Sequence, residues 1–311
     1  MEKFSLKGHG SMLLANVSWG LMSPLAKVVM AGGVVTPLVL TDMRIFGAMV
    51  LFWIVSAFRK PEHVPPRDML RLFTASLLAI VLNQGSFIMG VGLSSPADAS
   101  IITTSMPLWA MILAAVVLKE PVTGKKVAGI ALGACGALML ILGSGGGKAS
   151  ALDARHVAGD LLVLFAQLSY ASYLVLFKNF VSRYSLVTVM KWMFTYSFLC
   201  TLPFSYTSLA AMQWTALDAA TWASVSFIVV MATFVSYMLI VVGQKCLRPT
   251  VAGMYNYVQP VVACVVAVCL GLDTFNAMKG VAVVLIFGGV FLVTASKSRA
   301  QEVSERQSAG R

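Results

Sequence analysis

Long apolar stretches follow one another along the whole chain and are separated by short polar segments. A helix needs about 20 apolar residues to cross a bilayer core about 30 Å thick. The pattern predicts ten membrane-spanning helices, at residues 11–31, 37–58, 70–92, 97–118, 126–143, 159–178, 187–207, 222–243, 250–270 and 279–295. The first stretch is too long for a signal peptide, and no clear cleavage site of small residues follows it. We therefore expect an all-α membrane protein with ten transmembrane helices.

The second half of the chain repeats the first half. Ser18-Trp19 aligns with Ser169-Tyr170 at an offset of 151, and from the third span on the offset is 153. Aligned pairs at the second offset are Ala79 with Ala232, Gly90 with Gly243, Pro96 with Pro249, Pro107 with Pro260, Lys126 with Lys279 and Gly136 with Gly289. Chance similarity between alanine- and valine-rich helices is the alternative, but the aligned prolines favour a duplication.

A duplicated unit of five spans has a structural consequence, because five is an odd number. The second copy must enter the membrane from the opposite side, which gives two inverted five-helix repeats related by a pseudo-two-fold axis in the membrane plane. We place the first repeat at 8–147, a linker at 148–158, the second repeat at 159–297 and a cytoplasmic tail at 298–311. Two similar halves in opposite orientations can form two similar conformations, one open to each side.

Composition and charge agree with a membrane protein. Hydrophobic residues make up 59% of the 311 residues and charged residues 11%, whereas soluble domains have about 45–50% and about 25%. The net charge of +11 could indicate nucleic-acid binding, but the basic residues lie in short loops between apolar stretches. With the N-terminus inside, 17 of the 23 basic residues are in inner segments and three in outer loops. This bias predicts a multi-pass protein of the bacterial inner membrane with both termini cytoplasmic, and no nucleic-acid partner.

Sequence motifs for catalysis or metal binding are absent. The five cysteines contain no CxxC pair and lie mostly in apolar stretches, so we interpret them as packing residues. His9, His63 and His156 are scattered in predicted loops without metal-ligand spacing. The glycine-rich segment at 143–150 lacks both the first glycine and the Ser or Thr of a P-loop. We expect no catalytic residue, no metal and no cofactor.

Polar side chains inside the predicted spans are the candidates for a binding site. Asn83, Gln84, Tyr257 and Gln259 lie near mid-span and carry more polar surface than one contact satisfies, so we expect them to line a cavity. Trp19, Tyr170 and Tyr237 add hydrogen-bonding groups on spans 1, 6 and 8. Interhelical hydrogen bonding is the alternative for each single residue. Spans 5 and 10 contain almost no such side chains.

Arg44 lies about two turns inside the second span, deeper than Lys27 or Lys191, which can extend to the membrane surface. A buried Arg needs an anionic partner. That partner is Asp42, Asp98 or a carboxylate or phosphate of a substrate. Our hypothesis is that Arg44 faces the cavity and helps to bind the substrate or to gate its passage.

Prolines and terminal acids complete the set of candidates. Pro24, Pro107 and Pro260 each remove a backbone hydrogen bond inside a helix, which marks either a gate or a static kink. Glu120 and Asp273 lie at the ends of spans 4 and 9. We expect them to anchor helix ends and to pair with Lys125 or Lys279.

These residues give the chain a family resemblance. It resembles the EamA-type transporters of the drug/metabolite transporter superfamily over about residues 8–297. The matching features are Trp19 and Lys27 in span 1, Arg44 in span 2, and the segment from Pro107 through Lys119-Glu120-Pro121 to Gly129, Gly133 and Gly136, repeated more weakly as Pro260, Asp273, Gly280 and Gly289. Two positions depart from the pattern, because Tyr170 stands where Trp is common and Asp273 replaces Glu.

The resemblance implies a central cavity lined by spans 1–4 and 6–9, with spans 5 and 10 at the periphery. We expect a secondary transporter that works by alternating access and exports amino acids, amines or related metabolites. A nucleotide-sugar or lipid-linked substrate is the main alternative, and an intramembrane enzyme or a scaffold is a weaker one. Partners would be a small-molecule substrate and the lipid bilayer, with the protein a monomer or homodimer.

Overall fold

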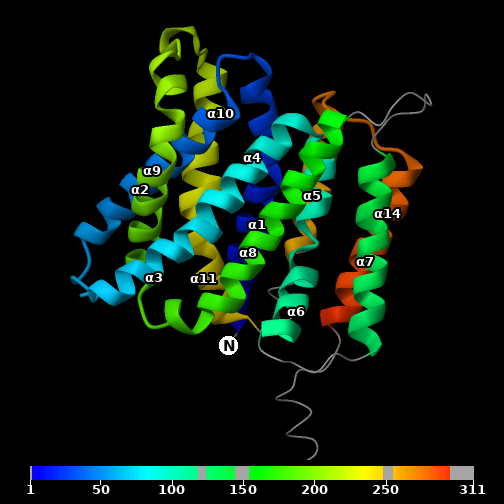
Figure 1. Ribbon diagram of the computed structural model, residues 1–311, viewed down its shortest axis with the longest axis horizontal. Coiled ribbons are helices and arrows are strands. Elements are labelled where there is room, and N and C mark those ends of the chain that lie inside the picture. The colour runs from blue at the N-terminus through cyan, green and yellow to red at the C-terminus, as the bar shows by residue number, and fades with distance from the viewer. Residues whose placement is uncertain (1, 118–123, 144–153, 248–254, 295–311) are drawn as a thin grey trace, which may run out of the picture.

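The computed structural model describes residues 2–117, 124–143, 154–247 and 255–294, and all regular secondary structure in these ranges is helical (Figure 1). The elements are α1 (Glu2–Ala31), α2 (Pro37–Ala57), α3 (Pro66–Ser76), η1 (Leu77–Leu82), α4 (Asn83–Leu93), α5 (Pro96–Thr103), α6 (Met106–Val117), α7 (Gly124–Gly143), α8 (Ala154–Val181), α9 (Leu186–Ala210), η2 (Trp214–Ala216), α10 (Ala219–Val229), η3 (Val230–Val235), α11 (Ser236–Cys246), η4 (Tyr255–Tyr257), α13 (Val258–Cys269) and α14 (Ala277–Thr294). The predicted all-α class is confirmed.

Six helical segments of the described residues are long and apolar enough to cross a membrane, judged by length and composition. They are Leu6–Ala31, Pro37–Ala57, Pro66–Leu93, Pro96–Val117, Ala154–Phe177 and Ala219–Gly243. Three shorter apolar helices lie within α7, α13 and α14. The described part of each predicted span is mainly helical, although α8 begins at Ala154 rather than at 159, and the number of ten spans stays a prediction. The predicted linker up to residue 153, the tail 298–311 and Glu120 lie outside the described residues.

Capping residues set where several helices begin. Thr36 caps α2 by accepting a hydrogen bond from the Val39 amide, and Pro37 follows at the first helical position. Ser95 caps α5 in the same way, followed by Pro96. Asp218 caps α10, and the hydrogen bonds from Thr221 hold the pKa of Asp218 below its ordinary value. Such residues satisfy amides that have no partner inside the helix.

Two π-helices show that the halves share an unusual local structure. η1 covers 77–82 and η3 covers 230–235, so the two elements are related by the same offset of 153 that aligns the halves of the sequence. Because π-helices are rare, their coincidence at equivalent positions supports the predicted duplication. The fourth and ninth predicted spans also share an interruption. α5 and α6 are separated at Thr104-Ser105, and η4 precedes α13 at the equivalent place.

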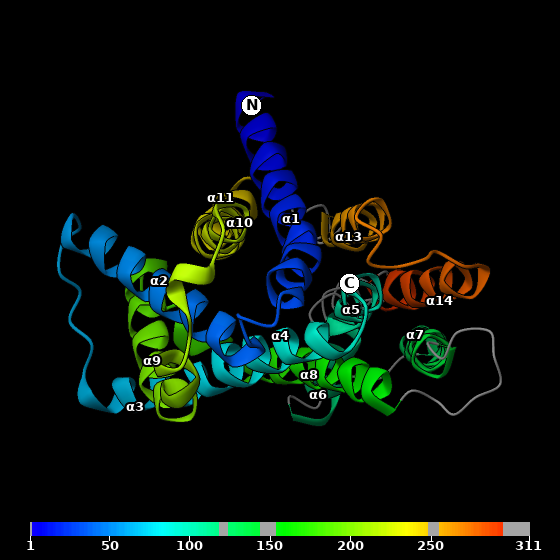
Figure 2. The same ribbon diagram turned by 90° about the horizontal axis from the view of Figure 1, so that it is seen from above.

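Helix packing repeats between the halves as well. α4 crosses α8 where Gly90 faces Gly159, and a Cβ on Gly90 would lie 2.7 Å from the Gly159 carbonyl oxygen. The equivalent helices α11 and α1 cross where Gly243 faces Gly8. The pairs α2–α9 and α7–α14 each join equivalent helices of the two halves. Figure 2 shows α7 and α14 together at one edge of the bundle, the peripheral position expected for spans 5 and 10.

Polarity is distributed as a lipid environment requires. Large apolar side chains such as Phe204, Val284 and Phe291 are exposed on the outside of the bundle. Polar side chains such as Asn16, Gln84 and Thr233 are buried inside it. Lipid chains offer no hydrogen-bond partner, so polar groups are stable only where other protein groups or a wet cavity satisfy them. The predicted two-repeat membrane fold is therefore confirmed.

The α7–α14 contact generates a stability prediction. A Cβ on Gly289 would lie 2.5 Å from the Gly129 carbonyl oxygen and 2.7 Å from the Gly133 amide nitrogen, both backbone atoms that cannot move aside. We expect Gly289→Ala to destabilise the protein by about 1–3 kcal/mol through overpacking. Thermal unfolding in detergent measures the effect. The matched control is Gly288→Ala, because a Cβ there meets nothing within 4 Å. Equal melting temperatures for the two variants would contradict the close approach.

Candidate functional site

The two halves meet in a hydrogen bond between equivalent residues. Gln84 is the second residue of α4 and Tyr237 the second residue of α11, and the offset of 153 aligns them. The Gln84 Nε2 amide donates to the Tyr237 hydroxyl at 3.3 Å. Residues related by a two-fold axis contact each other only close to that axis. The Gln84–Tyr237 pair therefore marks the pseudo-two-fold axis, directly after the two π-helices.

Arg44 reaches this centre from α2. Its side chain is 4% exposed, and its Nε donates to the Thr233 hydroxyl at 2.7 Å. Thr233 belongs to η3, and its hydroxyl in turn donates to the Ile228 carbonyl oxygen at 2.9 Å. This second bond spans five residues, which is the spacing of a π-helix. The π-helix thus places the hydroxyl where the guanidinium can donate to it.

Arg44 forms no ion pair among the described residues. Asp42, two residues earlier, accepts a hydrogen bond from Ser205 of α9 through its Oδ2. Asp98 pairs with Lys279, whose Nζ lies 3.1 Å from Asp98 Oδ1. Both acids proposed from the sequence as partners of Arg44 are therefore engaged elsewhere. A buried guanidinium without a carboxylate partner is unfavourable, and an anionic ligand would remove this cost.

Aromatic side chains and an unsatisfied amide complete the surroundings. The Trp19 indole nitrogen donates to the Ala232 carbonyl oxygen at 2.9 Å, and its ring meets the Tyr237 ring edge-on at a centroid distance of 6.2 Å. Tyr170 lies in the same buried aromatic cluster as Tyr237. Gln84 Oε1 is buried without a hydrogen-bond partner. Exchanging the amide oxygen and nitrogen would only transfer the unused position to the nitrogen, so the amide keeps one free hydrogen-bonding atom.

Asn83 and Gln259 form hydrogen bonds to helices of their own surroundings. The Asn83 amide donates to the Ala166 carbonyl oxygen at 2.8 Å between α4 and α8. The Gln259 amide donates to Asn16 Oδ1 at 2.7 Å between α13 and α1. Both contacts are interhelical hydrogen bonds of the kind that stabilise packing. The Tyr257 side chain lies outside the described residues. A binding role for Asn83, Gln259 and Tyr257 stays a prediction.

The three candidate prolines have different surroundings. Pro107 follows the interruption between α5 and α6, and Pro260 follows η4 at the equivalent position in the other half. Pro24 lies inside the continuous helix α1. Two of the three therefore lie beside a break in a membrane helix, where irregular backbone can form part of a binding region or a gate.

A second polar cluster, which sequence reasoning missed, lies at the end of the bundle away from the N-terminus. It brings together residues from α4, α5, α8 and the α13–α14 region, and we call it the His156 cluster. Its members are Ser94, Asp98, His156, Asp160, Asp273 and Lys279. The predicted pairing of Asp273 with Lys279 is present, at 2.7 Å. His156 lies in α8 and not in the predicted loop, and its spacing of four residues to Asp160 places both side chains on one face of this helix.

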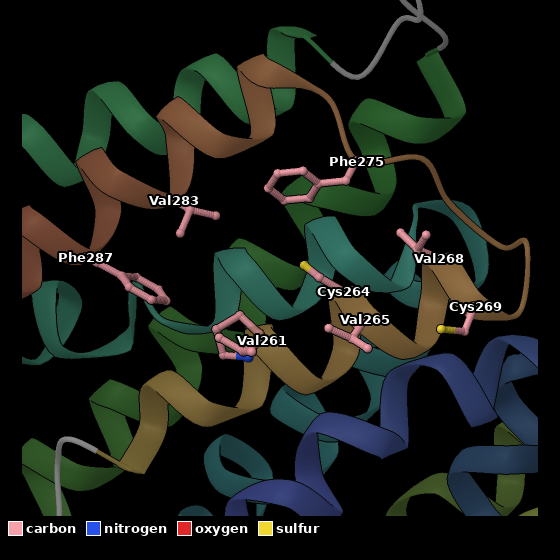
Figure 3. A pocket seen from close by; sticks show the side chains of 9 residues that line it. Val261, Cys264, Val265, Val268, Cys269, Phe275, Val283 and Phe287 are labelled. Carbon is pink, nitrogen blue, oxygen red and sulfur yellow. The ribbon is translucent and has the colours of Figure 1, made fainter.

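A separate cavity of about 450 Å³ opens between α13 and α14 (Figure 3). Its lining consists of apolar side chains and thiols: Pro260, Val261, Cys264, Val265, Val268, Cys269, Phe275, Val283 and Phe287. Val261 and Val265 are both largely exposed on the outside of the bundle. A groove without hydrogen-bonding side chains on an apolar surface suits lipid chains better than a polar ligand.

Comparison with known proteins identifies the family. A model of the EamA-like transporter family matches the chain twice, over residues 6–142 and 157–295. The uncharacterized transporter YetK of Bacillus subtilis (strain 168) is 22% identical over 251 residues, which are 81% of this chain and 74% of that protein. The uncharacterized transporter YyaM of the same organism is 22% identical over 64% of this chain and 65% of its own length.

A solved crystal structure has the same overall fold. It matches with a TM-score of 0.61 over 94% of this chain and 97% of that chain, at 19% sequence identity. Identity this low supports the arrangement of helices and leaves the ligand to be argued from the site itself.

The Arg44–Thr233 contact generates a second stability prediction. Thr233→Val keeps the shape of the side chain but removes the oxygen that accepts from Arg44. We expect a loss of about 1–3 kcal/mol, because the buried donor is left without a partner. Thr233→Ser keeps the oxygen and serves as the matched control. Chemical unfolding of the purified protein in detergent measures both. A Val variant as stable as the Ser variant would show that the bond contributes nothing.

Proposed function

The chain belongs to the EamA-like transporter family, and from this membership we propose that it carries a small metabolite across the membrane by secondary transport with alternating access. The relatives it matches are named as transporters. The substrate class is inferred from the chemistry of the site. We propose export of amino acids or closely related carboxylates from a bacterial cell.

One observation carries this assignment: Arg44 is buried beside the pseudo-two-fold axis and has no acidic partner among the described residues. Its Nε is already held by Thr233, which fixes the orientation of the planar guanidinium. A guanidinium held in this way binds a carboxylate through two parallel hydrogen bonds. The free amide atom of Gln84 adds a further polar contact nearby. Trp19 and Tyr237 offer aromatic surface for the rest of the metabolite.

The position on the axis suits alternating access. Each half contributes a π-helix directly before its residue of the Gln84–Tyr237 pair. π-Helices interrupt regular helical hydrogen bonding and often occur at functional sites. The two halves can rock against each other about a site at the axis. Contacts that close one end of the molecule in one state are then replaced by the equivalent contacts at the other end in the second state. The bound anion then stays in place while access to it changes sides.

Orientation and location form part of the same proposal. The excess of basic residues in the predicted inner segments supports cytoplasmic termini in a bacterial inner membrane. The His156 cluster then lies at the extracellular end, because α1 runs from the N-terminus toward it. The functional unit proposed is a single chain, since both halves of the site come from one polypeptide.

Replacing Arg44 tests the proposed function. The amino acid that accumulates in a deletion strain is chosen as the test substrate. Its flux is then measured with purified protein in liposomes and compared with the flux of the amine that lacks the carboxylate. Arg44→Gln should lower flux of the amino acid about 10- to 100-fold, the effect of losing a charge-assisted hydrogen bond. Lys191→Gln is the matched control, because Lys191 is also basic and within a helix but bonds to Ser56 beside Trp53. Its flux should equal that of the wild type.

Several outcomes would contradict the assignment. Full transport by a folded Arg44→Gln protein would remove Arg44 from the site. Faster transport of the amine than of the amino acid would exclude a carboxylate as the recognised group. Accumulation of a nucleotide sugar or a lipid-linked sugar in the deletion strain would favour the alternative substrate class.

A further inference from the structure

The His156 cluster surrounds one imidazole with oxygen atoms. His156 Nε2 lies 3.2 Å from Asp98 Oδ2, 3.1 Å from Ser94 Oγ and 4.0 Å from Asp160 Oδ2. The Ser94 hydroxyl donates its hydrogen to Asp160 Oδ1, so toward His156 it can only accept. Nε2 therefore faces acceptors alone and carries a hydrogen in every state of the ring. A second proton binds at Nδ1 and makes the imidazole a cation.

The second proton adds a positive charge to a cluster that contains both carboxylates and ammonium groups. The carboxylates are Asp98, Asp160 and Asp273, and the ammonium groups are those of Lys279 and Lys27. Lys279 bridges Asp98 and Asp273, at 3.1 and 2.7 Å. Lys27 donates to the carbonyl oxygens of Val91, Gly92 and Ser94 at the end of α4. The carboxylates that face His156 itself are Asp98 and Asp160, so a proton on Nδ1 places its positive charge beside two buried acids.

Two further titratable groups lie near the cluster. Arg155 precedes His156 on α8 and acts electrostatically on Lys27, but a guanidinium keeps its charge at every physiological pH, so Arg155 adds no pH dependence. The Cys264 thiol of α13 lies within electrostatic range of Asp98, Asp273 and Lys279, and thiols ordinarily titrate only above about pH 8. The imidazole is therefore the group in the cluster whose charge changes between about pH 5 and 8.

Solvent protons can reach His156 but not the acids behind it. The His156 side chain is 21% exposed, whereas the side chains of Asp98 and Asp160 are 1% and 0% exposed. The imidazole thus closes the opening of a small buried anionic pocket. A buried ion pair without such exposure could not respond to the pH outside.

The same three side chains could be suspected of binding a metal ion, since their ligand atoms lie within 4.8 Å of one another. The surroundings favour a proton instead. The Lys279 ammonium is in contact with Asp98 and would repel a divalent cation.

We propose that His156 is a proton-binding site that latches this end of the bundle. The imidazolium attracts Asp98 of the first half and Asp160 of the second, and so holds α5 against α8. Loss of the proton keeps the hydrogen bond from Nε2 but removes the positive charge between two carboxylates, which weakens the latch. The meaning of this latch for transport rests on the proposed function and orientation: acid outside closes the outer end, and neutral or alkaline conditions let it open.

The residues of the latch are not repeated at the equivalent positions of the sequence. At the offset that aligns the fourth and ninth spans, Asp98 corresponds to Val251, and at the offset of the first and sixth spans His156 corresponds to Ser5 and Asp160 to His9. Among the described residues His9 bonds to the Tyr255 hydroxyl, so the equivalent positions do not place an imidazole between two acids. A proton sensor on one side of an otherwise duplicated molecule makes the two access states respond differently to pH.

Thiol labelling from outside tests the latch. A reporter cysteine replaces Ser105, whose buried hydroxyl has no hydrogen-bond partner in the break between α5 and α6. The native cysteines are replaced, and cells are treated with a membrane-impermeant maleimide. In the protein that keeps His156, the cysteine at position 105 should be labelled roughly tenfold faster at about pH 8 than at about pH 5.5. His156→Gln imitates the neutral ring and should label rapidly at both pH values, and His156→Lys imitates the charged ring and should label slowly at both.

Three controls keep the result specific. His63→Gln changes an exposed loop histidine and should leave the pH dependence unchanged. A protein whose single cysteine is the exposed Cys269 corrects for the pH dependence of the thiol reaction itself. Arg44→Gln should lose transport but keep pH-dependent labelling, so that failure of the proposed function is distinguishable from failure of the latch.

The proposal is overturned if His156→Gln keeps the pH dependence, or if acid accelerates labelling of the wild type. Slowing of labelling by micromolar Zn²⁺ in a manner that requires His156 would make the cluster a metal site instead. Should the cysteine-free protein not fold, melting temperatures of the otherwise unmodified protein replace the labelling. The wild type should gain stability relative to His156→Gln as the pH falls from about 8 to about 5.5, and parallel profiles would overturn the latch.

Discussion

Lipid gives a polar side chain no partner, and this constraint decides where almost every informative residue of the protein lies. Gln84 and Thr233 are buried inside the bundle, while Phe204 and Val284 cover its outer surface. In a soluble protein the same polar side chains would lie mostly on the surface. Because the interior must satisfy its polar groups by itself, a group that stays unsatisfied is informative. Arg44, without an acidic partner among the described residues, is such a group, and the requirement for a counter-ion leads to the substrate class.

Pseudo-symmetry organises the interior, and departures from it carry the chemistry. The π-helices, the interruptions before Pro107 and Pro260 and the glycine crossings recur in both halves, so they belong to the scaffold shared by two conformations. The Gln84–Tyr237 bond joins equivalent positions that hold different residues. Asp98 has no acidic equivalent in the other half. In the proposed transport cycle, duplication supplies the two-state framework, and side chains present in one half only supply substrate recognition and response to pH.

The fold could be predicted from the sequence because its two signals need no knowledge of tertiary contacts. The length of an apolar stretch is a local property, and the repeat offset sums many weak residue matches along the chain. Polarity within a span singled out Trp19, Gln84 and Tyr237, which form hydrogen bonds inside the bundle, and their binding role stays a prediction. The sequence could not tell that Asn83 and Gln259 bond across neighbouring helices, because a side chain's partner depends on helix rotation and crossing angle. The His156 cluster was missed for another reason. Its members come from four separate segments, and reading 154–158 as a linker concealed the helical spacing of His156 and Asp160.

The two charged sites differ in what surrounds them, and this difference separates their roles. Arg44 lies beside the axis without a carboxylate partner among the described residues, so in the proposed function an anion completes the site. The His156 cluster contains its own acids and bases, and in the proposed latch a proton completes it. A substrate would relieve unfavourable desolvation at the first site, and a proton would place a positive charge between two carboxylates at the second. A ligand can shift a conformational equilibrium only by its differential affinity for the two states. Both sites meet this requirement, because the contacts that complete them come from opposite halves of the molecule.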